Sequence, residues 1–165
     1  MVERAGYLKE KSLYQPVKTE LEAIIKAKFP EFHLEITAKK SFSNELKSHI
    51  PQGRDIIFLF LKEASPDITG FIKQQNGVDF LIAEIKAEKI KLNDIYQTKK
   101  YAELFDARYA LLVSTKEIPV EIKRLSKVVY SMLSLPAYKT LTIANFDSHR
   151  GFVEWFPENP FLKGQ

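Results

Sequence analysis

The stretch DFLIAEIKAEKIK, from Asp79 to Lys91, places an acid and a base at the end of an apolar run. Side chains alternate along a strand, so Glu84 and Lys86 share one face with Phe80, while the residues between them lie on the other. Both faces are apolar, which is typical of a strand that is covered on both sides. Charges in such a strand cost free energy unless they are paired, bound to a metal or placed at an open end of the sheet. These two residues are therefore candidates for metal-ion or acid–base chemistry.

The dipeptide Asn76-Gly77, just before this strand, predicts a two-residue β-hairpin turn. A type I′ turn needs positive φ at both central positions, and Asn-Gly tolerates this best. With these two residues as the loop, Gln75 pairs with Val78, and the rest of the register follows by counting outward.

This register brings a third charged residue to the same face. Asp67 falls opposite Lys86 and Thr69 opposite Glu84, and directly paired residues share a face. The diagonal from Asp67 to Glu84 is then on the order of 7 Å at Cα. That is close enough for both carboxylates to hold one divalent ion.

The elements that must position these residues alternate between helical and extended patterns. Helices are expected where apolar residues recur at helical spacing between caps or prolines: Pro16 to Phe29, Asn93 to Asp106 and Pro119 to Leu133. Strands are expected in the short β-branched and aromatic runs: Phe32 to Lys39, Arg54 to Glu63, the two arms of the hairpin, Arg108 to Thr115, Thr140 to Phe146 and Gly151 to Phe156. The segment from Ser41 to Gly53 is expected to be a loop, and the tail that contains Pro157 and Pro160 to be irregular.

Composition limits the classes of protein that fit. The chain has 165 residues with 45% hydrophobic content, which suits one globular domain with a substantial core. The net charge of +4 and the pI near 9.1 are compatible with a polyanionic partner. The absence of cysteine excludes disulfides and thiolate metal sites. The charged start and the short longest apolar run, IIFLFL, predict a soluble, cytoplasmic protein with no membrane partner.

Three motifs together resemble the PD-(D/E)xK nuclease superfamily. Pro66-Asp67 matches the first half of its signature, Glu84-Ile85-Lys86 matches the second half, and Gln97 with Tyr101 fits the QxxxY pattern of its RecB-like branch. Each motif is weak alone, but the three in this order on a hairpin and the next helix are fairly specific. The resemblance implies a single α/β domain over residues 1–165 with a restriction-endonuclease-like fold, a mixed central sheet flanked by helices, whose core spans about 17–115.

The resemblance also implies a metal-dependent nuclease that hydrolyses phosphodiester bonds, with DNA as the favoured substrate. Asp67, Glu84 and the backbone carbonyl of Ile85 would hold Mg²⁺, for which Mn²⁺ can substitute. The ion would neutralise charge on the phosphate and lower the pKa of the attacking water. Lys86 would orient or help deprotonate that water and stabilise the developing charge.

Further residues complete the implied site. The family often has a carboxylate on the first helix; Glu20 lies nearer the apolar stripe than Glu22 and is preferred. Gln97 and Tyr101 join the catalytic set by their motif. Candidates for contacts with nucleic-acid phosphates are basic residues after the active-site strand and on the two later helices: Lys89, Lys99, Lys100, Lys123, Arg124 and Lys127. A homodimer or a larger assembly is compatible with the sequence.

Other interpretations stay open at this stage. Glu84 and Lys86 also fit a solvated strand end, Asp67 an ordinary turn, and Gln97 with Tyr101 the polar edge of a helix. At the level of function, the alternatives are a nuclease-fold module that binds nucleic acid or protein without cutting, and an accessory subunit of a restriction, repair or defence assembly. The three histidines lack ligand spacing and are interpreted as structural or surface residues: His33, His49 and His149.

Overall fold

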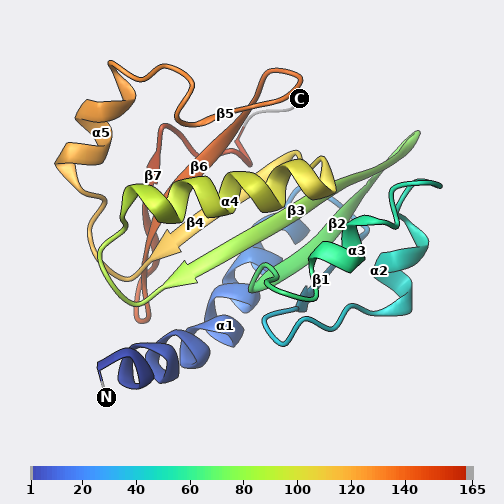
Figure 1. Cartoon of the computed structure of the whole chain (residues 1–165), viewed down its shortest axis with the longest axis horizontal. Coiled ribbons are helices and arrows are strands. Elements are labelled where there is room, and N and C mark those ends of the chain that lie inside the picture. Colours follow the sequence, from blue (N-terminus) through green and yellow to red (C-terminus); the bar gives the residue numbers. More distant parts are fainter. Residues whose placement is uncertain (1, 163–165) are drawn as a thin grey trace.

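The computed structural model describes residues 2–162, and its strands form one mixed seven-stranded sheet (Figure 1). The strands are β1 (Phe32–Ile36), β2 (Ile68–Gln74), β3 (Gly77–Lys86), β4 (Tyr109–Ser114), β5 (Ser134–Leu135), β6 (Lys139–Asp147) and β7 (Gly151–Phe156). Their order is β1-β2-β3-β4-β6-β5, with β7 also paired to β6. Strands β3, β4 and β6 run parallel to one another, and the remaining pairs are antiparallel.

Helices cover both faces of the sheet. They are α1 (Val2–Lys26), α2 (Asn44–Ser48), α3 (Ile57–Phe60), α4 (Leu92–Phe105) and α5 (Val120–Ser126). Figure 1 shows α1 behind the sheet and α4 in front of it. The expected α/β architecture, a mixed sheet flanked by helices in one domain, is therefore confirmed. No helix within residues 2–162 is long and apolar enough to cross a membrane.

Strand β3 separates two hydrophobic clusters, as its alternation predicts. Phe80 and Ile82 pack with α4 residues such as Phe105 on one face. Leu81 and Ile85 pack with the apolar stripe of α1 on the other face. Side chains two residues apart along a strand share a face, so Glu84 and Lys86 lie on the same side as Phe80 and Ile82. This is the α4 side of the sheet, at the carboxyl end of β3.

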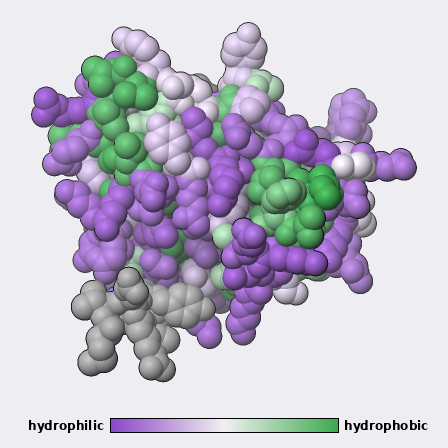
Figure 2. Space-filling view, viewed as in Figure 1, coloured by the Kyte–Doolittle hydropathy of each residue, from purple (hydrophilic) through white to green (hydrophobic). Residues whose placement is uncertain are grey.

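The prediction of a strand over residues 54–63 is wrong, because that segment forms turns and the short helix α3. Ile57 and Leu61 are buried while Ile56, Leu59 and Phe60 are 56–61% exposed, and this i, i+4 burial is helical rather than alternating. The expected loop before it also contains a helix, α2, whose N-cap Ser43 accepts a hydrogen bond from the Leu46 amide at 3.0 Å. Figure 2 shows the exposed residues of the 56–60 segment as a hydrophobic patch over α3.

Two expected helices also have different bounds. The first begins far before Pro16, at Val2, and ends at Lys26 rather than Phe29. The last ends at Ser126 rather than Leu133, and turns follow it. These turns bring residues 132 and 133 into the core, where the Leu133 carbonyl accepts from the Leu141 amide at 2.8 Å.

The hairpin forms, but its register differs from the predicted one by two residues. Gln74 pairs with Gly77, so the loop is Gln75-Asn76 and not Asn76-Gly77. Positive φ falls on Gly77 alone, at 138°, which the residue tolerates because it has no Cβ. A shift of two residues preserves the face of every side chain, so the predicted convergence of Asp67 and Glu84 is unaffected.

Candidate active site

Two buried carboxylates lie close together at the end of the hairpin. Ile68 pairs with Ala83, and Asp67 lies one residue before β2, beside this pair. The Asp67 amide donates to the Ala83 carbonyl at 3.1 Å, and Asp67 Oδ2 accepts from the Ile85 amide at 2.8 Å. Asp67 is 9% exposed and Glu84 5% exposed. The hairpin therefore holds both carboxylates out of bulk water.

These carboxylates resist ionisation in this environment. Burial, opposed in part by the Ile85 amide, raises the pKa of Asp67 from the ordinary 3.8 to about 6. Burial and then the charge of Asp67 raise the pKa of Glu84 well above its usual range. Glu84 Oε1 is buried without a hydrogen-bond partner among the described residues. A buried, unpaired carboxylate oxygen costs free energy that a bound cation would recover.

Lys86 supplies a positive charge on the same face. Its Nζ lies 3.6 Å from Asp94 Oδ1 in α4, and its side chain is 24% exposed. Burial lowers the pKa of Lys86, but Glu84, Asp94 and the other nearby carboxylates outweigh it, and the net shift is upward. Lys86 is therefore an ammonium group at neutral pH.

Helix α1 contributes two residues that the sequence did not single out, Glu10 and Tyr14. The Tyr14 hydroxyl is a hydrogen-bond donor to Asp67, which helps to hold the carboxylate charge. Glu10 is near enough for its charge to act on Asp67, Glu84 and Lys86. Burial, opposed by the charge of Lys86, raises the pKa of Glu10. The first-helix carboxylate beside this site is thus Glu10.

The structure does not bring the preferred Glu20 to the site. The Glu20 carboxylate lies beside Gly151, with Oε1 2.8 Å from the position of an added Cβ. Glu22 forms an ion pair with Lys18 at 3.2 Å. Ten residues separate Glu20 from Glu10, which corresponds to about 15 Å along a helix. The predicted helix begins at Pro16 and leaves residue 10 outside it, so Glu10 is not among the candidates from the sequence.

Gln97 and Tyr101 lie on the side of α4 that faces the sheet. Gln97 Nε2 donates to the Tyr101 hydroxyl oxygen at 3.0 Å, and Tyr101 is 1% exposed. Burial raises the pKa of Tyr101, and the charges of Glu84 and Asp67 add to this effect. The structure therefore places Gln97 and the buried Tyr101 close enough to Asp67 and Glu84 for the two carboxylate charges to act on the Tyr101 hydroxyl.

The oxygen atoms at this site could supply some, but not all, of the ligands that a hard divalent cation needs. Asp67 and Glu84 offer carboxylate oxygens, which Mg²⁺ prefers. In an antiparallel pair the N–H and C=O of one residue point to the same side, so the Ile85 carbonyl faces the Asp67 side as its amide does. Among the described residues, no group of three histidine, aspartate or glutamate side chains forms a ready-made metal site. A metal here would need oxygen ligands beyond Asp67 and Glu84.

The basic residues nearest the strand end and on α5 are partly engaged in ion pairs. Lys89 Nζ lies 3.8 Å from Glu121, and both side chains are largely exposed. Lys123 pairs with Glu154 of β7. Exposed pairs are worth about 0–1 kcal/mol, so Lys89 remains available to a phosphate.

The other four predicted basic residues differ in their surroundings. Lys99 Nζ donates to a carbonyl in the turns after α5 at 2.9 Å. Lys100 is exposed, with Nζ 5.1 Å from the ring centroid of Tyr101. Arg124 and Lys127 are exposed at the end of α5. Of these four, Lys100 is the cation that contacts a residue of the candidate site.

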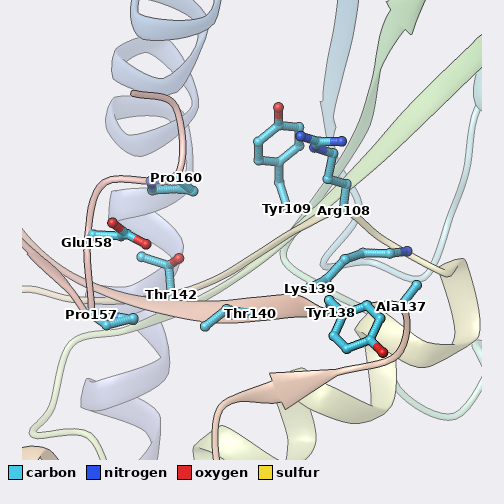
Figure 3. Close-up of a pocket in the computed structure, with 10 residues that line it drawn as sticks. All are labelled: Arg108, Tyr109, Ala137, Tyr138, Lys139, Thr140, Thr142, Pro157, Glu158 and Pro160. Atoms are coloured by element: carbon cyan, nitrogen blue, oxygen red, sulfur yellow. The ribbon is translucent and has the colours of Figure 1, made fainter. Parts of the chain in front are cut away.

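A pocket of about 320 Å³ lies at the other end of the parallel strands (Figure 3). It is lined by the starts of β4 and β6, the turn before β6 and the segment after β7. Ala137 and Tyr138 in that turn have φ of 60° and 61°, a conformation that non-glycine residues rarely adopt. None of the residues predicted for catalysis lines this pocket, so it is separate from the candidate site.

No protein-family model, curated protein or solved structure matches this chain. The function therefore has to be inferred from the chain's own residues and their geometry.

The raised pKa of Asp67 makes the metal-free protein sensitive to pH. An acid whose pKa is higher in the folded state stabilises the fold below its unfolded value, and this stabilisation is lost as the pH rises through the folded value. For Asp67 the loss runs from about pH 4 to pH 7 and is on the order of 3 kcal/mol at most. We expect melting temperatures in EDTA to fall between pH 5 and pH 7.5.

Asp67→Asn is the variant that tests this cause. It keeps the shape and removes the charge, so we expect the metal-free variant to melt roughly 2–8 °C above the wild type at pH 7.5. Its response to pH should be weaker, and added Mg²⁺ or Mn²⁺ should stabilise it less than the wild type. An ordinary turn aspartate would behave in the opposite way and lose about 0.5–1 kcal/mol. A destabilised variant with an unchanged metal response would contradict a metal site at Asp67.

Proposed function

We propose that this protein is a metal-dependent nuclease of the PD-(D/E)xK superfamily with a restriction-endonuclease-like fold. It hydrolyses phosphodiester bonds of nucleic acid, with DNA as the favoured substrate. One observation carries the proposal: Glu84 keeps a buried carboxylate oxygen that has no hydrogen-bond partner in the described part of the chain, beside a second buried carboxylate, Asp67. Two like charges in an apolar sheet are costly, and binding a divalent cation is the function that would retain them.

Asp67, Glu84 and the Ile85 carbonyl are the groups that would hold the ion. Mg²⁺ or Mn²⁺, when bound there, would supply charge neutralisation at the phosphate and a water of lowered pKa. The Tyr14 hydroxyl and the Ile85 amide orient the Asp67 carboxylate by hydrogen bonds. This pre-orientation removes part of the cost of organising the site when substrate binds.

Lys86 acts as a cation in this proposal rather than as a base. Its raised pKa keeps the proton on Nζ, so the ammonium group donates hydrogen bonds to the phosphate oxygens that gain negative charge as water attacks phosphorus. The bond between the water oxygen and phosphorus forms and the ester P–O bond breaks; the attacking water gives up a proton to solvent, and the leaving oxygen takes up a proton from solvent. The partial exposure of Lys86 leaves its side chain reachable by a substrate.

A second function, binding nucleic acid without cutting it, would use the exposed cations Lys100, Arg124 and Lys127. In that case Asp67, Glu84 and Lys86 form a charge cluster whose net effect on stability does not depend on added metal.

Cleavage assays on three substrates separate the two functions. Supercoiled plasmid, linear duplex and single-stranded DNA are incubated with Mg²⁺, Mn²⁺ or EDTA. The proposal predicts that at least one substrate is cut with metal and none is cut in EDTA. Activity that persists unchanged after thorough chelation contradicts the mechanism, and binding without cleavage of any substrate supports the second function.

A further inference from the structure

A cavity of about 590 Å³ opens between α1 and the segment that follows β1. Its walls combine apolar side chains with exposed cations and short polar groups. Its lining includes Lys11, Tyr14, Ile36, Lys39, Ser41 and Phe42, together with one acidic residue, Glu35. Cavities of about 300–1,000 Å³ hold drug-sized organic ligands, so a single nucleobase fits within this volume.

The outer wall of the cavity is held in place by hydrogen bonds. The Ser43 amide donates to Glu35 Oε2 at 2.8 Å, and the Ser43 hydroxyl bonds to the same carboxylate. The Phe42 ring packs edge-on against Phe58 with centroids 5.1 Å apart. The segment that carries Phe42 is therefore a preformed surface rather than one that must be ordered by a ligand.

The cavity is directly connected to the carboxylate site. Tyr14 lines the cavity and is also a hydrogen-bond donor to Asp67. Thr37, between two cavity residues, donates its amide to the Asp67 carbonyl at 2.8 Å and its hydroxyl to the Pro66 carbonyl at 2.6 Å. A ligand that spans the two places would pass over Tyr14.

We propose that this cavity binds one unpaired nucleobase of a nucleic-acid strand whose backbone lies across Asp67 and Glu84. The proposal rests on the proposed nuclease function and specifies its substrate as single-stranded or locally unpaired nucleic acid. The Phe42 ring and Ile36 supply an apolar surface for a base. Lys11 and Lys39 are exposed at the cavity and suit the flanking phosphates. A base within an intact duplex is stacked and paired on both sides, so it cannot enter unless it is extruded.

Binding in EDTA tests the base contact without any cleavage. Fluorescence anisotropy compares a labelled oligothymidine of about ten nucleotides, an abasic strand of the same length and a duplex of the same length. The two single strands carry the same charges, so their difference isolates the bases. We expect oligothymidine to bind about 10-fold more tightly than the abasic strand and more tightly than the duplex.

Variants locate this preference in the cavity. Phe42→Ala should reduce the preference for oligothymidine, measured as the ratio of its affinity to that of the abasic strand. Ser41→Trp should abolish this preference, because the indole fills the cavity from an exposed position and leaves the core intact. The double variant Lys11→Ala, Lys39→Ala should weaken the binding of both single strands by the same factor. Lys26→Ala is the matched control, since it removes an exposed lysine about 22 Å further along α1 and should leave binding unchanged.

The outcomes distinguish this proposal from the nuclease proposal. Equal binding of the oligothymidine and abasic strands by the wild type, duplex binding as tight as that of oligothymidine, or an unchanged ratio in Ser41→Trp each overturns the cavity assignment, even if the protein cuts DNA. A preference that Ser41→Trp abolishes, in a protein that cuts nothing with Mn²⁺, supports the cavity and removes the nuclease function.

Discussion

Replacing Lys86 by alanine is expected to lower the rate of cleavage by about 10²–10⁴-fold. The substitution removes the ammonium group that the proposal places against the phosphate. Mn²⁺ affinity should change little, because Lys86 is not a ligand in this account, and kcat should fall more than KM rises. Single-turnover cleavage at saturating Mn²⁺ measures the effect.

The matched control for this variant is Lys28→Ala, which removes an exposed lysine between α1 and β1. β1 begins beside the hairpin turn, at the end of the sheet away from Asp67, so this variant should keep the wild-type rate within about twofold, since surface charges away from the reaction contribute little. A Lys86→Ala variant that cleaves as fast as Lys28→Ala would reduce Lys86 to the ion-pair partner of Asp94.

Glu84→Gln should abolish metal-dependent cleavage at Mn²⁺ concentrations that saturate the wild type. Loss of residues that merely support a metal ligand costs about 10–100-fold in affinity or activity, and loss of a ligand should cost at least that much. The neutral amide also removes the repulsion with Asp67. The metal-free variant should therefore be more stable than the wild type at neutral pH, so loss of activity cannot be ascribed to unfolding.

The control here is Glu88→Gln, which neutralises an exposed carboxylate four residues along the chain. It should leave both cleavage and the melting temperature near their wild-type values. If Glu84→Gln lowered the melting temperature and left the metal response unchanged, the buried carboxylate would be a structural acceptor rather than a ligand.

The convergence of Asp67 and Glu84 could be predicted from the sequence although the register could not. Successive side chains of a strand point to opposite faces, so a register that is wrong by two residues still assigns every side chain to the correct face. The error arose at the turn, where positive φ falls on Gly77 alone, and the loop is Gln75-Asn76. Which residues pair across the hairpin depends on that turn geometry.

The sequence pattern places the start of the first helix at Pro16, so the residues that α1 brings to the site fall outside the predicted helix. Proline normally begins or breaks a helix, yet here it lies inside one that starts at Val2. Glu10, Tyr14, Val17 and Leu21 are spaced by three or four residues and thus share one face. That spacing was present in the sequence, and extending the helix backwards would have identified Glu10 and Tyr14.

The short helix α3 shows a different limit. Its run of Ile, Phe and Leu is apolar at every position, so periodicity cannot separate a buried strand from a helix with one exposed side. Only the packing decides: Ile57 and Leu61 turn into the core and Leu59 with Phe60 remain exposed.

The dependence of the cleavage rate on Mn²⁺ concentration, for wild type and Asp67→Asn prepared in parallel, tests the central claim most directly. The substrates are the plasmid, the linear duplex and the single strand. The account predicts that the wild-type rate rises from the background in EDTA to a plateau, whereas Asp67→Asn stays at background or needs more than about 10-fold more Mn²⁺. A wild-type rate that is the same in EDTA and in Mn²⁺, or a variant that follows the wild-type curve, would contradict it.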